Sequence, residues 1–129
     1  MTSAHPRVLL ASAVDQLGRA EVVAWCCRLI LGQDRADDPD LRWLGGTEDW
    51  PPYWRRVWGA RGLLYVWDDS ALDAVATALA DGHWRVREMG LKVVRAQCLD
   101  GLTGEVAALR EDENARVRAA AERALVALT

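Results

Sequence analysis

Two segments of this chain share the pattern Asp-x-x-x-Arg-Val-Arg, in which the Asp is followed six residues later by the last Arg. Asp81 precedes Arg87 and Asp112 precedes Arg118, so the second pair repeats the first at an offset of 31 in residue number. A carboxylate near the start of a helix accepts backbone N–H groups, and an Arg guanidinium can bind the same carboxylate through two parallel hydrogen bonds. These four side chains are equipped for charge-assisted hydrogen bonding, and we expect them to fasten neighbouring parts of the fold.

Residues that could carry catalysis occur without the partners that catalysis needs. His5 stands near the amino end and His83 opens an expected helix, and neither has a Ser or Cys in motif register. The acidic clusters at residues 37–40 and 68–73 lack the ligand order of a calcium-binding loop. From these residues we expect no enzymatic activity, no cofactor and no metal site.

A second set of residues is suited to binding a partner. Basic and aromatic side chains recur at helical spacings of three and four along two neighbouring segments. Trp, Tyr and Arg dominate the energetically important positions of protein interfaces. The candidate partner-binding residues are Trp54, Trp58, Arg61, Tyr65, Arg85, Glu88, Lys92 and Arg95.

The aromatic residues around the Pro-Pro dipeptide allow two interpretations. Trp50, Tyr53, Trp54 and Trp58 either pack together beneath the preceding loop or form an exposed cluster for a partner. The chain has seven Trp and no Phe, so some Trp side chains must fill the core. Both interpretations stay open at this point.

Length and composition favour one globular domain. Hydrophobic residues make up 51% of the 129 residues and charged residues 27%, and the net charge of −3 does not favour nucleic acid. Cys26, Cys27 and Cys98 form no C-x-x-C motif, and residues 1–7 show no signal-peptide pattern. The most apolar run, residues 22–31, is far short of the ~20 residues that cross a bilayer. We expect a cytoplasmic protein that does not contact a membrane.

Apolar residues that recur at three and four predict helices throughout, and strand patterns are almost absent. Ser70, with Asp73 three residues later, is expected to cap one helix start in a capping-box-like arrangement. The segment after the Pro-Pro dipeptide is expected to be helical from Tyr53 to Trp67. In the single domain 1–129, the four expected helical hairpins span approximately residues 6–32, 39–67, 70–99 and 103–128.

The segments that begin at Asp81 and Asp112, each with a Val before the Arg, resemble HEAT repeats. The short bacterial type, which is also found in phycobilin lyases, is the most similar. This resemblance implies an all-α fold, namely an α-α superhelix or solenoid of about four hairpins. It also implies that the turn Asp and the helix Arg form a hydrogen-bonded ladder between repeats, which gives Asp81, Arg87, Asp112 and Arg118 structural roles.

The unit at residues 39–67 matches these repeats only by its interval. Val57 corresponds to Val86 at an offset of 29 in residue number, and Pro52 and Trp58 then occupy the places of the Asp and the Arg. This Trp-rich unit therefore lacks the Asp–Arg signature.

Together these features predict a non-catalytic scaffold or protein–protein interaction module. Its partner, most simply another protein, would bind on a concave face that carries Trp and Arg. The alternatives are a nucleic-acid-binding module and an accessory subunit of an enzyme. HEAT-like DNA glycosylases that remove alkylated purines grip DNA with Trp, Tyr, Arg and Asp; this chain has similar ingredients but is shorter and net acidic. We expect a monomer or a weak homodimer.

Overall fold

The computed structural model describes residues 4–129, and residues 1–3, the start of the stretch considered for a signal peptide, lie outside it. The described residues form seven α-helices and four 3₁₀-helices, with no strand among them. The expectation of an all-α fold is confirmed for this part of the chain. None of these helices has the length and apolar character that spanning a membrane requires.

Short turns connect most of the helices. In chain order the helices are α1 Pro6–Leu17, α2 Arg19–Ile30, η1 Leu41–Leu44, α3 Tyr53–Gly62, η2 Asp69–Ala71, α4 Leu72–Leu79, α5 Trp84–Gln97, η3 Asp100–Leu102, α6 Thr103–Ala108, η4 Leu109–Glu111 and α7 Ala115–Leu128.

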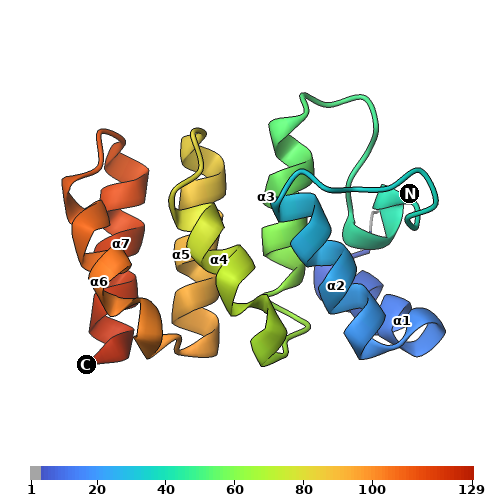
Figure 1. The fold of residues 1–129 in the computed structure, drawn as a ribbon, viewed down its shortest axis with the longest axis horizontal. Helices are drawn as coiled ribbons and strands as arrows, with labels where there is room; N and C mark the ends of the chain where they lie inside the picture. The colour runs from blue at the N-terminus through green and yellow to red at the C-terminus, as the bar shows by residue number, and fades with distance from the viewer. Residues whose placement is uncertain (1–3) are drawn as a thin grey trace.

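The helices are arranged in two layers. Helices α2, α4 and α6 lie in one layer and α3, α5 and α7 in the other, so that three pairs stand side by side in a row (Figure 1). Within the second layer α5 packs directly against both α3 and α7. Helix α1 packs on α2 and η1 at the amino-terminal end of the row.

Helices α1 and α2, which are joined at Gly18, pack on each other within residues 6–32, whereas the main partner of α3 lies outside the expected hairpin at residues 39–67. Helix α3 packs more extensively on α2 than on η1, although residues 31–52 separate α2 from α3. The 3₁₀-helix η1 has only two buried residues, whereas α2 has six and can cover the apolar side of α3. Helix α3 ends at Gly62 and not at Trp67, because the next three N–H groups bond three residues back instead of four.

Glycine permits the close approach of α3 to α2. A Cβ at Gly59 would lie 2.7 Å from the backbone oxygen of Cys26 and 2.9 Å from Cβ of Leu29. Gly90 holds the corresponding place on α5, at an offset of 31 in residue number, and a Cβ there would lie 3.2 Å from Cβ of Ala78 on α4. The corresponding glycines indicate that α2 and α3 pair in the same way as α4 and α5.

Side-chain caps begin several of the helices. The side chains of His83 and Asn114 each accept the N–H of the residue two positions later, at 3.1 and 2.9 Å, and so cap α5 and α7. The expected cap at Ser70 is wrong. Asp68 accepts the N–H of Ser70 at 2.9 Å, which starts η2, and α4 begins only at Leu72. The Ser70 hydroxyl donates to the same carboxylate, and among residues 4–129 no side chain accepts an N–H at the start of α4.

A buried Arg joins the second pair of helices to the third. Arg87 binds Asp112 through two hydrogen bonds, Nε to Oδ2 at 2.8 Å and Nη2 to Oδ1 at 3.1 Å. Its remaining nitrogen, Nη1, donates to the carbonyl of Asp81 at 2.8 Å, and Asp112 also accepts the N–H of Asn114 at 2.9 Å. One guanidinium therefore fastens the turn of its own pair to the turn of the next pair.

The same contact joins the first pair to the second, which corrects the expectation that the Trp-rich unit lacks the signature. Arg56 binds Asp81, with Nε to Oδ2 at 2.7 Å and Nη2 to Oδ1 at 3.3 Å. Arg56 corresponds to Arg87 at an offset of 31 in residue number, whereas the offset of 29 points to Trp58. The Arg of the signature is therefore present in this unit, and only its own turn Asp is missing.

The third Arg of the series has a different environment. Arg118 is exposed, and its Nη1 donates to the carbonyls of Asp112 and Glu113 at 2.8 and 3.1 Å. Within residues 4–129 its guanidinium meets no carboxylate. Arg118 therefore braces its own turn but does not join two pairs.

The Arg–Asp contact predicts a large difference between two equivalent substitutions. Arg87→Ala leaves the carboxylate of Asp112 buried without its cation, so we expect the free energy of unfolding to fall by about 3 kcal/mol. Arg118→Ala is the matched control, since it removes the same side chain from an exposed position, and we expect a loss below about 1 kcal/mol. Urea denaturation at neutral pH measures both values, and equal losses would contradict a fastening role for Arg87.

The approach of α3 to α2 predicts the effect of adding one methyl group. Gly59→Ala should lower the free energy of unfolding by about 1–3 kcal/mol, because the new Cβ overlaps backbone and side-chain atoms of α2. Gly82→Ala is the control, since a Cβ there would meet no atom within 4 Å. An unchanged urea midpoint for Gly59→Ala would show that α2 and α3 do not pack this closely.

Candidate partner-binding face

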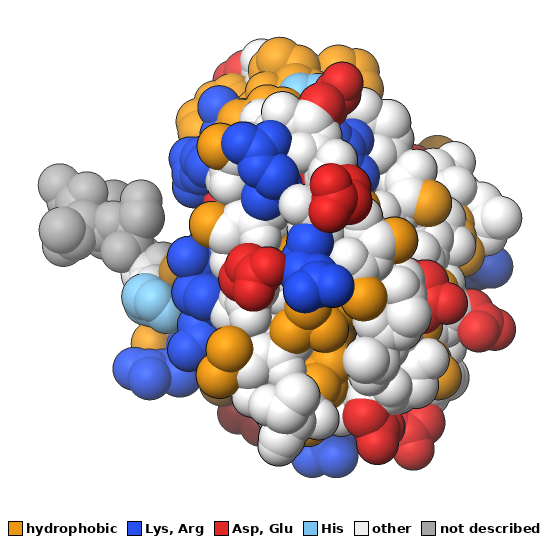
Figure 2. Space-filling view, turned by 90° about the vertical axis from the view of Figure 1, so that its left-hand side faces the viewer, with side chains coloured by type: hydrophobic (Ala, Val, Ile, Leu, Met, Phe, Trp, Pro, Cys, Tyr) orange, Lys and Arg blue, Asp and Glu red, His pale blue; other side chains and the backbone are white. Residues whose placement is uncertain are grey.

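Corresponding residues of α3, α5 and α7 form rows across the second layer, because these helices pack side by side and repeat at an offset of 31 in residue number. One row is Trp54, Arg85 and Arg116, and the next is Arg61, Lys92 and Arg123. We call the outward side of α5 and α7 the cationic face, and define it by Arg85, Lys92, Arg95, Arg116 and Arg123. Figure 2, which views the molecule from its α6–α7 end, shows Lys and Arg side chains gathered along the left-hand edge.

Two arginines of the cationic face lie against indole rings. The guanidinium carbon of Arg85 is 4.5 Å from the ring centroid of Trp84 and 5.2 Å from that of Trp54. The guanidinium carbon of Arg116 is 5.2 Å from the Trp84 ring. Cations within about 6 Å of an indole face are attracted by its quadrupole. The rings therefore hold both guanidinium groups in defined positions.

Glu88, which the sequence places among the partner-binding residues, is only 7% exposed. Its neighbour α7 packs alongside α5 and covers this position. Arg116 of α7 donates from Nε to Oε2 of Glu88 at 3.0 Å. Glu88 thus positions Arg116. The residue that is available to a partner here is Arg116, whose side chain is 62% exposed.

Trp58, another residue expected on the partner-binding strip, is only 2% exposed. The backbone at Gly46 lies directly over its ring and leaves no room for a Cβ there. Trp50 is 52% exposed, and its ring packs against Trp54 at a centroid distance of 5.0 Å. The aromatic cluster is therefore partly core and partly surface.

Arg61 and Tyr65, the other α3-side candidates, contact the amino-terminal part of the chain. Arg61 donates from Nη2 to the carbonyl of Leu44 at 2.8 Å, and burial lowers the pKa of its guanidinium. Tyr65 is 38% exposed and meets the ring of His5 edge-on at a centroid distance of 5.8 Å. These contacts separate the expected strip into an occupied α3 part and an open α5 part, where Lys92 and Arg95 are exposed.

Three members of this arrangement are not identified by the sequence as belonging to it: Trp84, as the ring beneath two arginines, and Arg116 and Arg123. The repeat interval is the sequence feature that could have identified Arg116 and Arg123. An offset of 31 in residue number, applied to Arg85 and Lys92, leads to Arg116 and Arg123.

His83 connects the cap of α5 to the aromatic cluster. Its ring stacks on Tyr53 at a centroid distance of 3.6 Å and an angle of 11°. Its Nδ1 accepts the N–H of Arg85, which requires the neutral form of the ring. Partial burial and the nearby Arg85 lower the pKa of His83, and this favours the neutral capping form.

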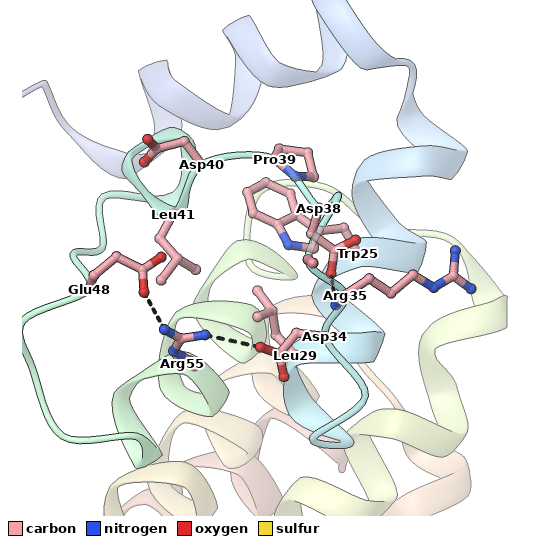
Figure 3. Close-up of a pocket in the computed structure, with 11 residues that line it drawn as sticks. Trp25, Leu29, Asp34, Arg35, Asp38, Pro39, Asp40, Leu41, Glu48 and Arg55 are labelled. Carbon is pink, nitrogen blue, oxygen red and sulfur yellow. Dashed lines mark hydrogen bonds and ion pairs between the residues drawn. The ribbon is translucent and has the colours of Figure 1, made fainter.

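A cavity of about 290 Å³ lies between the segment 34–41 and helices α2 and α3 (Figure 3). Arg55 in its wall binds Asp34 at 3.0 Å and also contacts Glu48. Asp38 accepts a hydrogen bond from Arg28 at 2.6 Å. Burial opposes the charged form of Asp38 most strongly, but the hydrogen bonds from Arg28 and from the N–H of Arg35, together with the charges of both arginines, hold the pKa of Asp38 below its usual value. Asp40 binds Arg42 at 3.0 Å, so every carboxylate that lines the cavity is already paired with an arginine.

The rest of the described chain contains no grouping of three or more His, Cys, Asp or Glu side chains that could hold a metal ion.

Comparison with protein families, characterised proteins and solved structures finds no match to this chain. The function is therefore inferred from the chemistry of the cationic face.

The environment of His83 predicts a pH dependence of stability. Because the pKa of His83 is lowered in the folded protein, the unfolded chain takes up the proton first as the pH falls. The contribution of His83 is complete above its unfolded pKa of about 6.5 and is lost as the pH falls toward the lower folded value. His83→Asn, which copies the cap at Asn114, should flatten this loss in urea denaturation between about pH 7.5 and 5.

His5→Asn serves as the control because it removes the other His of the chain. If His5→Asn and not His83→Asn flattens the pH dependence, the assignment to His83 is wrong.

Proposed function

We propose that this protein is a non-catalytic interaction module that binds another protein on the cationic face. The observation that supports this is the alignment of five cations on two adjacent helices. Two of these cations, Arg85 and Arg116, are held against indole rings. Arginines whose side chains are already positioned lose less conformational entropy on binding. Such residues are also frequent among those that contribute most to interface affinity.

The proposal includes a HEAT-like α-α superhelix as the architecture of the module, with the cationic face on its concave side. The recurrence of Arg56, Arg87 and Arg118 at a constant offset of 31 in residue number supports it. So do the equivalent contacts of the first two arginines with a turn Asp of the following pair. Stacked pairs of this kind contact only their neighbours and leave one long face for a partner.

A cytoplasmic location is also part of the proposal. Cys26, Cys27 and Cys98 are free thiols, and burial raises the pKa of Cys26 to about 12. Unpaired thiols of this kind are ordinary in a reducing compartment. We also propose that the protein is a monomer or a weak homodimer.

Charge reversal on the cationic face tests the proposed function. Tagged wild-type protein and the double variant Lys92→Glu/Arg123→Glu would be used to capture proteins from a lysate of the source cells. We expect at least one protein to be captured by the wild type and reduced about tenfold or more with the variant, because reversed charges repel the partner. Quantitative mass spectrometry measures the captured amounts, and circular dichroism checks that the variant is folded.

The matched control is Arg19→Glu/Arg110→Glu, which makes the same charge change at exposed positions outside the cationic face. This variant should capture the same proteins as the wild type. If both double variants, or neither, lose the captured proteins, binding does not take place on the cationic face.

A further inference from the structure

The cationic face has a strong excess of positive charge. On α5 the stripe that carries this face consists of Arg85, Glu88, Lys92 and Arg95, of which Glu88 is buried, and on α7 it consists of Arg116, Ala119, Arg123 and Val126. Of these eight positions, five are basic and one is acidic. Glu88 is buried against Arg116, so it offsets only that cation. The face is therefore a local exception in a chain whose net charge is −3.

The guanidinium of Arg85 is in place for a ligand. It lies near the rings of both Trp84 and Trp54, and no acceptor within residues 4–129 takes a hydrogen bond from its side chain. Planar guanidinium groups bind carboxylates and phosphates through two parallel hydrogen bonds. A partner with carboxylate or phosphate groups would thus complete contacts that the protein itself leaves open.

The spacing of the cations matches that of side chains on an α-helix. Arg85 and Lys92 are seven residues apart on α5, and so are Arg116 and Arg123 on α7, which corresponds to about 10.5 Å along each helix. A partner helix repeats its own face every seven residues over the same ~10.5 Å. Carboxylates two turns apart on such a helix would meet both levels of cations. The small side chain of Ala119 leaves room for it beside α7.

The ring of Trp84, which lies beside the cations, favours a polypeptide over nucleic acid. Proteins that bind single-stranded nucleic acid stack bases on open aromatic faces. Trp84 instead has Arg85 and Arg116 against its ring, and Trp58 is buried. One of the five cations is offset by Glu88. The face therefore has fewer free cations than are needed for the roughly 6–10 phosphate contacts of a DNA-binding protein.

We propose that the cationic face binds an acidic α-helical segment of a partner protein, which lies along α5 and α7. This inference rests on the proposed function and adds the chemistry of the partner. Carboxylates on one side of the segment pair with the row of Arg85 and Arg116 and, two turns further, with the row of Lys92 and Arg123. The positioned arginines of the first row fix the register, and the lysine and arginine of the second row add affinity.

Defined probes test this inference without knowledge of the natural partner. Two fluorescent Ala-rich peptides of roughly 20 residues, long enough to form helices, would contain the same number of Glu residues. In one peptide all Glu residues lie on one side of the helix at spacings of three, four and seven; in the other they are distributed around it. A single-stranded DNA of similar length is the third probe. Fluorescence anisotropy at about 25 and 150 mM salt measures the affinities, and NMR amide shifts locate the site.

We expect the one-sided peptide to bind about tenfold more tightly than the scrambled peptide and to shift amide signals of α5 and α7. Lys92→Glu/Arg123→Glu should weaken this binding about tenfold, and Arg19→Glu/Arg110→Glu should leave it unchanged. Equal binding of the two peptides, or tighter binding of DNA on the same residues, would overturn the acidic helix as the partner.

The failures of the two proposals are distinguishable. If proteins captured from the lysate depend on Lys92 and Arg123 but the one-sided peptide does not bind, the cationic face is a binding surface for a partner of other chemistry. If neither the captured proteins nor the peptide respond to the charge reversal, both proposals fail.

Discussion

The stacking of the helix pairs depends on one requirement: an Arg of one pair must meet a carboxylate from the next pair. Arg87 satisfies it by contacting the turn of its own pair and Asp112 of the next, and Arg56 makes the equivalent bond to Asp81. These bonds have direction, so they set both the separation and the register of neighbouring pairs. Because the register is the same at both junctions, corresponding residues of successive pairs come to lie beside one another across the second layer.

The cationic face follows from this register, and it brings like charges close together. Arg85 and Arg116 approach the same ring, an arrangement that two guanidinium groups would resist in the absence of other contacts. The indole of Trp84 and the carboxylate of Glu88 supply the opposing attraction. A residue that is buried, Glu88, therefore determines how an exposed one is presented. Positive charge is concentrated on this face by internal contacts and not by an excess of basic residues in the chain.

The sequence predicts the carboxyl-terminal half of the fold well because its signals there are local. The expected hairpins at residues 70–99 and 103–128 end within two residues of the ends of α5 at Gln97 and α7 at Leu128. The amino-terminal half depends on contacts between distant segments, and no local pattern indicates that α3 pairs with α2 across residues 31–52. For the same reason the burial of Trp58 beneath Gly46, and of Glu88 beside α7, lies beyond what helical spacing can reveal. The role of Arg56 escapes the sequence only because an offset of 29, instead of 31, aligns its unit with the others.

The long connection between α2 and α3 gives the cavity beside it a different meaning. All of residues 31–52 lie in this connection, whereas only residues 80–83 join α4 to α5. Closing the longer loop costs about 1.5 kcal/mol more in chain entropy. The ion pairs of Arg28 with Asp38, and of Arg55 with Asp34 and Glu48, tie this loop down at both ends. The charges that surround the cavity are therefore anchors of a tethered loop, and the hollow is the space that the loop spans.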